Sequence, residues 1–200
     1  MFVMRLFLSV IILIFSLQSW TKADDIRDFE LEGISLKDNI EDFLTKSEIK
    51  NSKVKIFKTE EYITLQFNGS KFDSNEYDLI EINYKNPILI VENISGVKLF
   101  KLVQKCFDKQ NEIISDLKGM FSKNNEVKFL DKETKIHGGD PSGESTYTRA
   151  SFLFNDGSKI SIDCNNFAEK FMKERGLLPQ LYLAIDSKEF DSFLNSGRAY

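Results

Sequence analysis

The stretch 147–164, YTRASFLFNDGSKISIDC, decides the fold class. Two segments that alternate apolar and polar residues, 147–154 and 159–164, flank the tetrapeptide Asn-Asp-Gly-Ser at 155–158. Asp-Gly between alternating segments is the strongest short-range hairpin signal, because both central turn positions then adopt positive φ. The stretch therefore predicts an antiparallel β-hairpin.

A long amphipathic helix is predicted before this hairpin, at residues 101–121. Its apolar positions recur at intervals of three and four residues, which places them on one face. They include Val103, Phe107, Ile114, Leu117 and Phe121. A helix of this length spans about 30 Å. We expect its apolar face to cover a sheet rather than to receive a partner.

The remaining segments add further strands and two shorter helices. Strands are predicted at 29–32, 54–58, 62–67, 79–84, 88–94, 127–130 and 181–185. A helix is predicted at 35–45, where Leu36, Ile40 and Leu44 share a face after a capping-box-like start at Ser35. A short helix follows Ser187, and Ser95-Gly96 indicates a bulge or a corner.

This order of elements predicts the α+β class, with antiparallel sheet and one long helix packed on a face. Local hairpin pairing without regular βαβ spacing favours that class over a parallel sheet. Residues 24–200 are expected to form a single α+β domain. The order also allows two halves, 24–96 and 97–200, that each consist of a helix followed by a meander.

Residues 1–23 have the pattern of a secretory signal peptide. Arg5 precedes the apolar run LFLSVIILIFSL at 6–17, and a polar stretch then ends in the small residue Ala23. Cleavage after Ser19 is the alternative, and an uncleaved anchor stays open. We therefore expect an exported protein, periplasmic or extracellular, without stable membrane insertion after cleavage.

The chain has two cysteines, Cys106 and Cys164. An even count in an exported chain predicts a disulfide, because oxidising compartments form and keep such bonds. This bond would tie the long helix to the second strand of the hairpin. Two buried free thiols are the alternative.

No complete catalytic or ligand-binding set occurs in the sequence. His137 is the single histidine, and it lies in the loop HGGDPSGEST with Asp140 and Ser142, but no Gly-x-Ser-x-Gly elbow accompanies it. Asp140, Ser142 and Glu144 alternate as oxygen donors without the rest of a calcium loop. We expect no catalytic residue, no cofactor and no metal. A net charge of −4 without a basic block argues against a nucleic-acid partner.

Four aromatic residues fit none of the apolar stripes described above. They are Phe72, Tyr77, Tyr147 and Tyr200. An exposed group of aromatic side chains would mark a site for a partner.

The chain resembles a family of small exported proteins of marine alphaproteobacteria of the Pelagibacter type. The likeness lies in the stretch DDIRDFELEGISL at 24–36, in Cys106 at the start of a helix, in the Asp-Pro-Ser-Gly loop at 140–143, in a strand cysteine like Cys164, and in the Ser-Lys-Glu-Phe stretch at 187–190. Where relatives often have glycine, this chain has Lys37. The resemblance implies an exported location and this architecture, and it implies no activity.

Three functions follow from these observations. The first is a non-enzymatic exported binding or interaction module with an unknown protein or small-molecule partner. The second is an envelope-assembly or structural accessory protein. The third is a hydrolase that uses the His137 loop. The sequence favours a protein that is not an enzyme.

Overall fold

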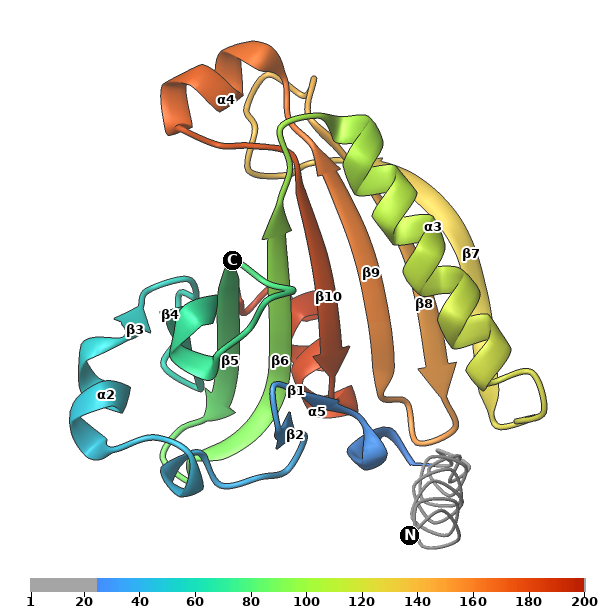
Figure 1. Cartoon of the computed structure of the whole chain (residues 1–200). Coiled ribbons are helices and arrows are strands. Elements are labelled where there is room, and N and C mark those ends of the chain that lie inside the picture. Colours follow the sequence, from blue (N-terminus) through green and yellow to red (C-terminus); the bar gives the residue numbers. More distant parts are fainter. Residues whose placement is uncertain (1–24, 200) are drawn as a thin grey trace, which may run out of the picture.

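Eight antiparallel strands form one large sheet that dominates the computed structural model, which describes residues 25–199 (Figure 1). The predicted signal peptide and Tyr200 lie outside the described residues. The strands follow the order β3-β4-β5-β6-β10-β9-β8-β7. Their bounds are β3 Lys53–Val54, β4 Tyr62–Asn68, β5 Leu79–Lys85, β6 Ile90–Leu99, β7 Val127–Ile136, β8 Thr146–Phe154, β9 Lys159–Asn166 and β10 Gln180–Asp186.

The sheet consists of two four-stranded meanders that meet in its middle. β3 to β6 form the first meander and β7 to β10 form the second. The two meanders are joined where β6 pairs with β10, with Ile94 opposite Ile185. The α+β class and the antiparallel sheet predicted from the sequence are confirmed.

The helices lie on both sides of this sheet. α3 (Val103–Met120) packs against β9 and β10 on one face, and α5 (Lys188–Asn195) lies behind the sheet in Figure 1. The shorter helices are α2 (Lys46–Asn51) and α4 (Glu169–Arg175). In the part of the chain that the structure describes, no helix combines the length and the apolar character needed to cross a membrane.

Strand alternation gives the sheet an apolar face and a polar face. Ile82, Ile94, Ile162 and Ile185 belong to the main core, which includes Ile114 of α3. On the opposite face, Phe57, Tyr62, Phe190, Phe193 and Ala199 form a second, smaller core under α5. The long helix and α5 therefore each bury a separate cluster.

A ladder of polar side chains crosses the second face and links the two meanders. Thr64 Oγ1 donates to Asn83 Oδ1 at 2.5 Å, and Asn83 Nδ2 donates to Asn93 Oδ1 at 2.6 Å. Asn93 Nδ2 in turn donates to Asp186 Oδ1 at 2.6 Å. Lys159 continues the ladder, with its Nζ 4.0 Å from Asp186 Oδ2. Five strands are thus joined by buried side-chain interactions as well as by their backbones.

Asp186 makes this ladder sensitive to pH. Burial raises the pKa of Asp186 to about 6, against the attraction of Lys159 and the hydrogen bond from Asn93, which lower it. A carboxyl whose pKa is higher in the folded chain than in the unfolded chain stabilises the fold below the unfolded pKa, and that contribution is lost as the pH rises through about 6.

We expect the stability difference between the wild type and Asp186→Asn to shift by about 2 kcal/mol against the wild type between pH 4 and pH 7. Subtracting the free energies of unfolding of the two proteins removes the pH dependence of every titratable group that they share, so the remaining pH dependence is that of Asp186. Urea denaturation at several pH values measures it. A difference that stays constant over this range would show that Asp186 ionises as it does in the unfolded chain.

The predicted helix at 35–45 is wrong. Ser35 ends the short strand β2 (Ile34–Ser35), and Lys37 has a left-handed φ of 71° that an α-helix cannot contain. Leu36, Ile40 and Leu44 are buried as expected, but the only helical turn between residues 35 and 45 is the short 3₁₀ helix η2 (Ile40–Asp42), and the rest of this segment is irregular. The helix begins later, at a capping box formed by Thr45 and Glu48.

Two further details of the predicted strands are wrong. No bulge or corner occurs at Ser95-Gly96, because β6 continues to Leu99 and the irregularity in the ladder lies between Asn83 and Tyr84. In the hairpin turn at 155–158, only Gly157 has positive φ, at 89°. The four-residue loop needs a single left-handed residue, unlike the two-residue turn that the Asp-Gly signal suggests.

Cys106 and Cys164 lie at bonding distance. Their Sγ atoms are 2.08 Å apart, and both residues are fully buried. Cys106 belongs to the first turns of α3 and Cys164 to β9. The link fastens the start of the long helix to the middle of the second meander.

Candidate ligand-binding site

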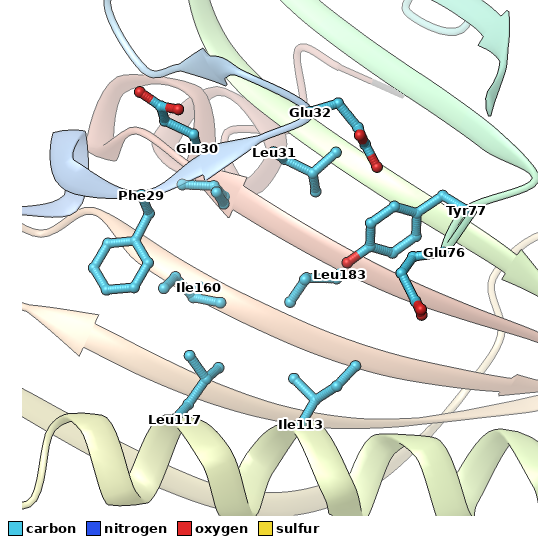
Figure 2. A pocket seen from close by; sticks show the side chains of 11 residues that line it. Phe29, Glu30, Leu31, Glu32, Glu76, Tyr77, Ile113, Leu117, Ile160 and Leu183 are labelled. Carbon is cyan, nitrogen blue, oxygen red and sulfur yellow. The ribbon is translucent and has the colours of Figure 1, made fainter. Parts of the chain in front are cut away.

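A groove of about 280 Å³ lies between α3, the sheet and the N-terminal segment (Figure 2). This volume is near the lower end of the range of about 300–1,000 Å³ that is typical of small-molecule sites. We call it the groove. Its lining residues are Phe29, Glu30, Leu31, Glu32, Glu76, Tyr77, Ile113, Leu117, Ile160, Leu183 and Ile185.

The floor and one wall of the groove are aliphatic. Leu183 and Ile185 are two residues apart on β10, so they point to the same face, and Ile160 lies opposite Ile185 on β9. Ile113 and Leu117 are one turn apart on α3 and point toward this floor in Figure 2. The apolar face of α3 therefore covers the sheet as predicted, but Ile113 and Leu117 do not fill the space above β9 and β10, and the groove remains.

The N-terminal segment forms the other wall. A short 3₁₀ helix, η1 (Ile26–Asp28), leads into the hairpin of β1 (Glu30–Leu31) and β2 (Ile34–Ser35). Glu32 and Gly33 turn this hairpin with φ values of 54° and 78°. Leu31 and Ile34 are buried, which holds the hairpin on the sheet.

Phe29 closes one end of the groove with aromatic contacts. Its ring centroid lies 5.4 Å from that of Phe121, at the end of α3, and 5.9 Å from that of Phe154 in β8. Aromatic pairs at these separations are favourable beyond the area they bury. This end of the groove is apolar.

Tyr77 lines the opposite end, and a glycine makes room for it. A Cβ atom on Gly96 of β6 would lie 2.5 Å from the Tyr77 ring, closer than real contacts allow. Gly96 therefore makes room for Tyr77 and does not form the bulge or corner predicted at Ser95-Gly96. The ring lies on the sheet and its hydroxyl group faces the groove (Figure 2).

Carboxylates surround the Tyr77 end. Burial raises the pKa of Tyr77 to about 12, and the negative charges of Glu76 and Glu32 add to the effect. Tyr77 is therefore a neutral hydrogen-bonding phenol at physiological pH. Glu76 Oε2 lies 3.7 Å from Lys98 Nζ and 3.8 Å from Lys109 Nζ. Within residues 25–199, no lysine or arginine forms an ion pair with Glu32.

The His137 loop is arranged differently from a catalytic site. The carboxylate of Asp140 accepts hydrogen bonds from the backbone and hydroxyl groups of Ser142 and Ser145, and these bonds lower the pKa of Asp140 to about 2. His137 Nδ1 accepts from the backbone of Gly139 instead, at 3.2 Å. The His137 ring packs on Phe167, and burial lowers the pKa of His137.

Hydrogen bonds within the loop also use the oxygen atoms of Asp140 and Ser142, two of the three residues that alternate as potential calcium ligands in the sequence. Ser142 Oγ also accepts from the backbone of Glu144, so Asp140 and Ser142 stabilise the turn through each other. In the described part of the chain, no three His, Cys, Asp or Glu side chains are grouped as metal ligands. The structure brings Asp140 and Ser142 together as a turn, and the backbone N–H of Asp140 donates to the carbonyl oxygen of His137 at 3.1 Å. Among the hydrogen bonds of the described residues, none joins the His137 imidazole to the side chain of Asp140 or Ser142.

Sequence reasoning identified one residue of the groove as unusual. Tyr77 fits no apolar stripe, and it lines the groove, whereas Phe72 packs on Phe67 and Tyr147 lies under Arg149. The other lining residues have the sequence pattern of ordinary core positions or of surface acids, so the sequence does not mark them as part of a site. The chain matches no known family model, no curated protein and no solved structure at a significant level.

Proposed function

We propose that the protein is a non-enzymatic exported binding module that holds a small apolar molecule in the groove. The observation that carries the proposal is the aliphatic groove itself. Its floor of Ile160, Leu183 and Ile185 and its wall of Ile113 and Leu117 belong to three different elements, yet they leave about 280 Å³ open between them. Apolar surface that is buried by a ligand stabilises the complex, at about 25 cal/mol for each Å² removed from water.

Export is supported by the sequence and by the cysteines. The pattern of residues 1–23 is that of a signal peptide, and the two cysteines lie at bonding distance. Such bonds persist in oxidising compartments, which include the periplasm and the extracellular space. We infer that the mature chain works there.

The polar groups of the groove favour binding over catalysis. Tyr77 holds its proton far above physiological pH, which makes it a poor general base. It can still donate one hydrogen bond to the polar end of a ligand and accept another. Glu30, Glu32 and Glu76 stand at the rim rather than on the aliphatic floor.

Calorimetric titration with octanol tests the proposal. We expect saturable binding of one octanol per chain, because a neutral eight-carbon chain needs only the aliphatic floor. Ile113→Trp should weaken this binding by about tenfold or more, since an indole at this position fills the groove. Leu102→Trp is the matched control, because Leu102 precedes α3, is 64% exposed and does not line the groove.

Both variants should keep the far-ultraviolet circular dichroism and the cooperative urea unfolding of the wild type, which shows that they are folded. Equal octanol affinity in a folded Ile113→Trp protein would contradict the proposed site. Absence of saturable binding to the wild type would contradict the proposed function.

A further inference from the structure

The groove has two chemically different ends, and this polarity determines how a ligand would lie in it. Phe29, with its aromatic neighbours, forms one end, and Tyr77 with Glu76 forms the other (Figure 2). Glu32 projects from the N-terminal hairpin toward the Tyr77 end in the same view. A ligand with an apolar body therefore has a single favourable orientation.

We infer that the ligand of the groove is a small amphiphilic cation, an alkyl or aryl body with one protonated nitrogen, whose charge lies at the end formed by Glu32, Glu76 and Tyr77. The inference rests on the proposed function, because it names the class of molecule that the same groove takes. The apolar body lies over Leu183 and Ile160, and its far end points toward Phe29.

Glu32 provides the charge that is free for a ligand. Glu32 is half-buried, it lines the groove, and no lysine or arginine among residues 25–199 forms an ion pair with it. An acid without a partner at the mouth of an apolar site attracts positive charge and repels anions. An anionic amphiphile of the same length would be disfavoured for the same reason.

Glu76 contributes despite its two lysine neighbours. Lys98 and Lys109 approach Glu76 Oε2 but neither of them lines the groove. Their positive charge therefore lies outside the space that a ligand would occupy. The effect of Glu76 and Glu32 on Tyr77 supports this arrangement, because both acids raise the pKa of its hydroxyl group.

The Tyr77 hydroxyl group gives the cation a neutral partner. A protonated amine is a donor only, and a phenol oxygen accepts hydrogen bonds. The ring is fixed on Gly96, so the hydroxyl group is held in place before a ligand arrives. A ligand then loses less free energy to the ordering of the site.

Titration with three eight-carbon ligands at low salt, octylammonium, octanol and octanoate, tests the inference. We expect octylammonium to bind up to about tenfold more tightly than octanol, mainly through the unpaired carboxylate of Glu32. Octanoate should bind more weakly than octanol. Raising the salt concentration should reduce the advantage of octylammonium, because salt screens exposed charges.

Glu32→Gln and Asp28→Asn form a matched pair of variants. Each removes one negative charge from the N-terminal segment, but Asp28 belongs to η1, is exposed and does not line the groove. Glu32→Gln should lower the octylammonium preference about fivefold, whereas Asp28→Asn should leave it nearly unchanged. Equal losses in the two variants would overturn the placement of the cation.

The ligand series separates this inference from the proposed function. Octanol binding without an advantage for octylammonium would overturn the cationic ligand and leave the binding module standing. No binding of either molecule would overturn both. Octylammonium binding that is lost in Ile113→Trp and reduced in Glu32→Gln supports both.

Discussion

Replacing Cys106 and Cys164 together with alanine is expected to lower the free energy of unfolding by about 4 kcal/mol. The two residues are separated by 58 positions, so their link closes a long loop and restricts the unfolded chain strongly. Both are fully buried between α3 and β9, where the link also fixes the helix that forms one wall of the groove. Urea denaturation of the oxidised wild type and the double variant measures the difference.

The reduced wild type separates the link from the packing of the sulfur atoms. We expect the reduced protein to lose most of the same stability, because it keeps both side chains and lacks only the bond. Mass spectrometry of the protein recovered from producing cells should show two hydrogens fewer than the dithiol form. Free thiols in that material, or equal stability of the oxidised and reduced proteins, would contradict the role of the pair.

Phe193→Ala is expected to cost about 3–5 kcal/mol of folding stability, which is the usual range for a buried phenylalanine. Phe193 is 1% exposed and is the centre of the small core under α5. Its ring centroid lies 4.7 Å from that of Tyr62 and 5.2 Å from that of Phe57. Its removal leaves a cavity between α5 and the sheet that these rings cannot fill.

Phe43→Ala is the matched control for this loss. Phe43 is 39% exposed, compared with 1% for Phe193, so its truncation removes less buried surface and should cost about 1–2 kcal/mol. Chemical denaturation of both variants gives the comparison. Similar costs at the two positions would show that α5 is not anchored by its aromatic cluster.

Elements with strong local patterns were predictable from the sequence. The hairpin of β8 and β9 and the helix α3 lie within one or two residues of their predicted bounds. The first has an alternating pattern on both sides of a glycine-containing turn, and the second repeats its apolar spacing over five turns. Nothing from distant parts of the chain is needed to define either one.

The segment at 35–45 shows where local patterns fail. Its apolar spacing is that of a helix, but it is held by distant partners: Lys37 N donates to Val91 O and Ile40 N donates to Leu89 O. An irregular segment that returns to one surface at intervals also buries every fourth residue. Periodicity alone cannot distinguish these two cases.

The groove could not be predicted because it depends on how distant segments meet. Ile113 and Leu117 belong to a stripe that looks like ordinary core in the sequence, and the space beside them is set by the N-terminal hairpin. The pair Ser95-Gly96 predicts a bulge or a corner, whereas Gly96 makes room for Tyr77, which lies in the segment before β5. In the sequence, the groove is indicated by Tyr77 alone, because this aromatic residue fits none of the predicted apolar stripes.

The central claim is that the groove between α3, the N-terminal hairpin and the sheet holds the ligand. Nuclear Overhauser contacts between bound octylammonium and methyl groups of the protein test it most directly. We predict contacts from the octyl chain to Leu117, Leu183 and Ile160, with the nitrogen end next to Tyr77. Contacts confined to methyl groups outside the groove would contradict the claim.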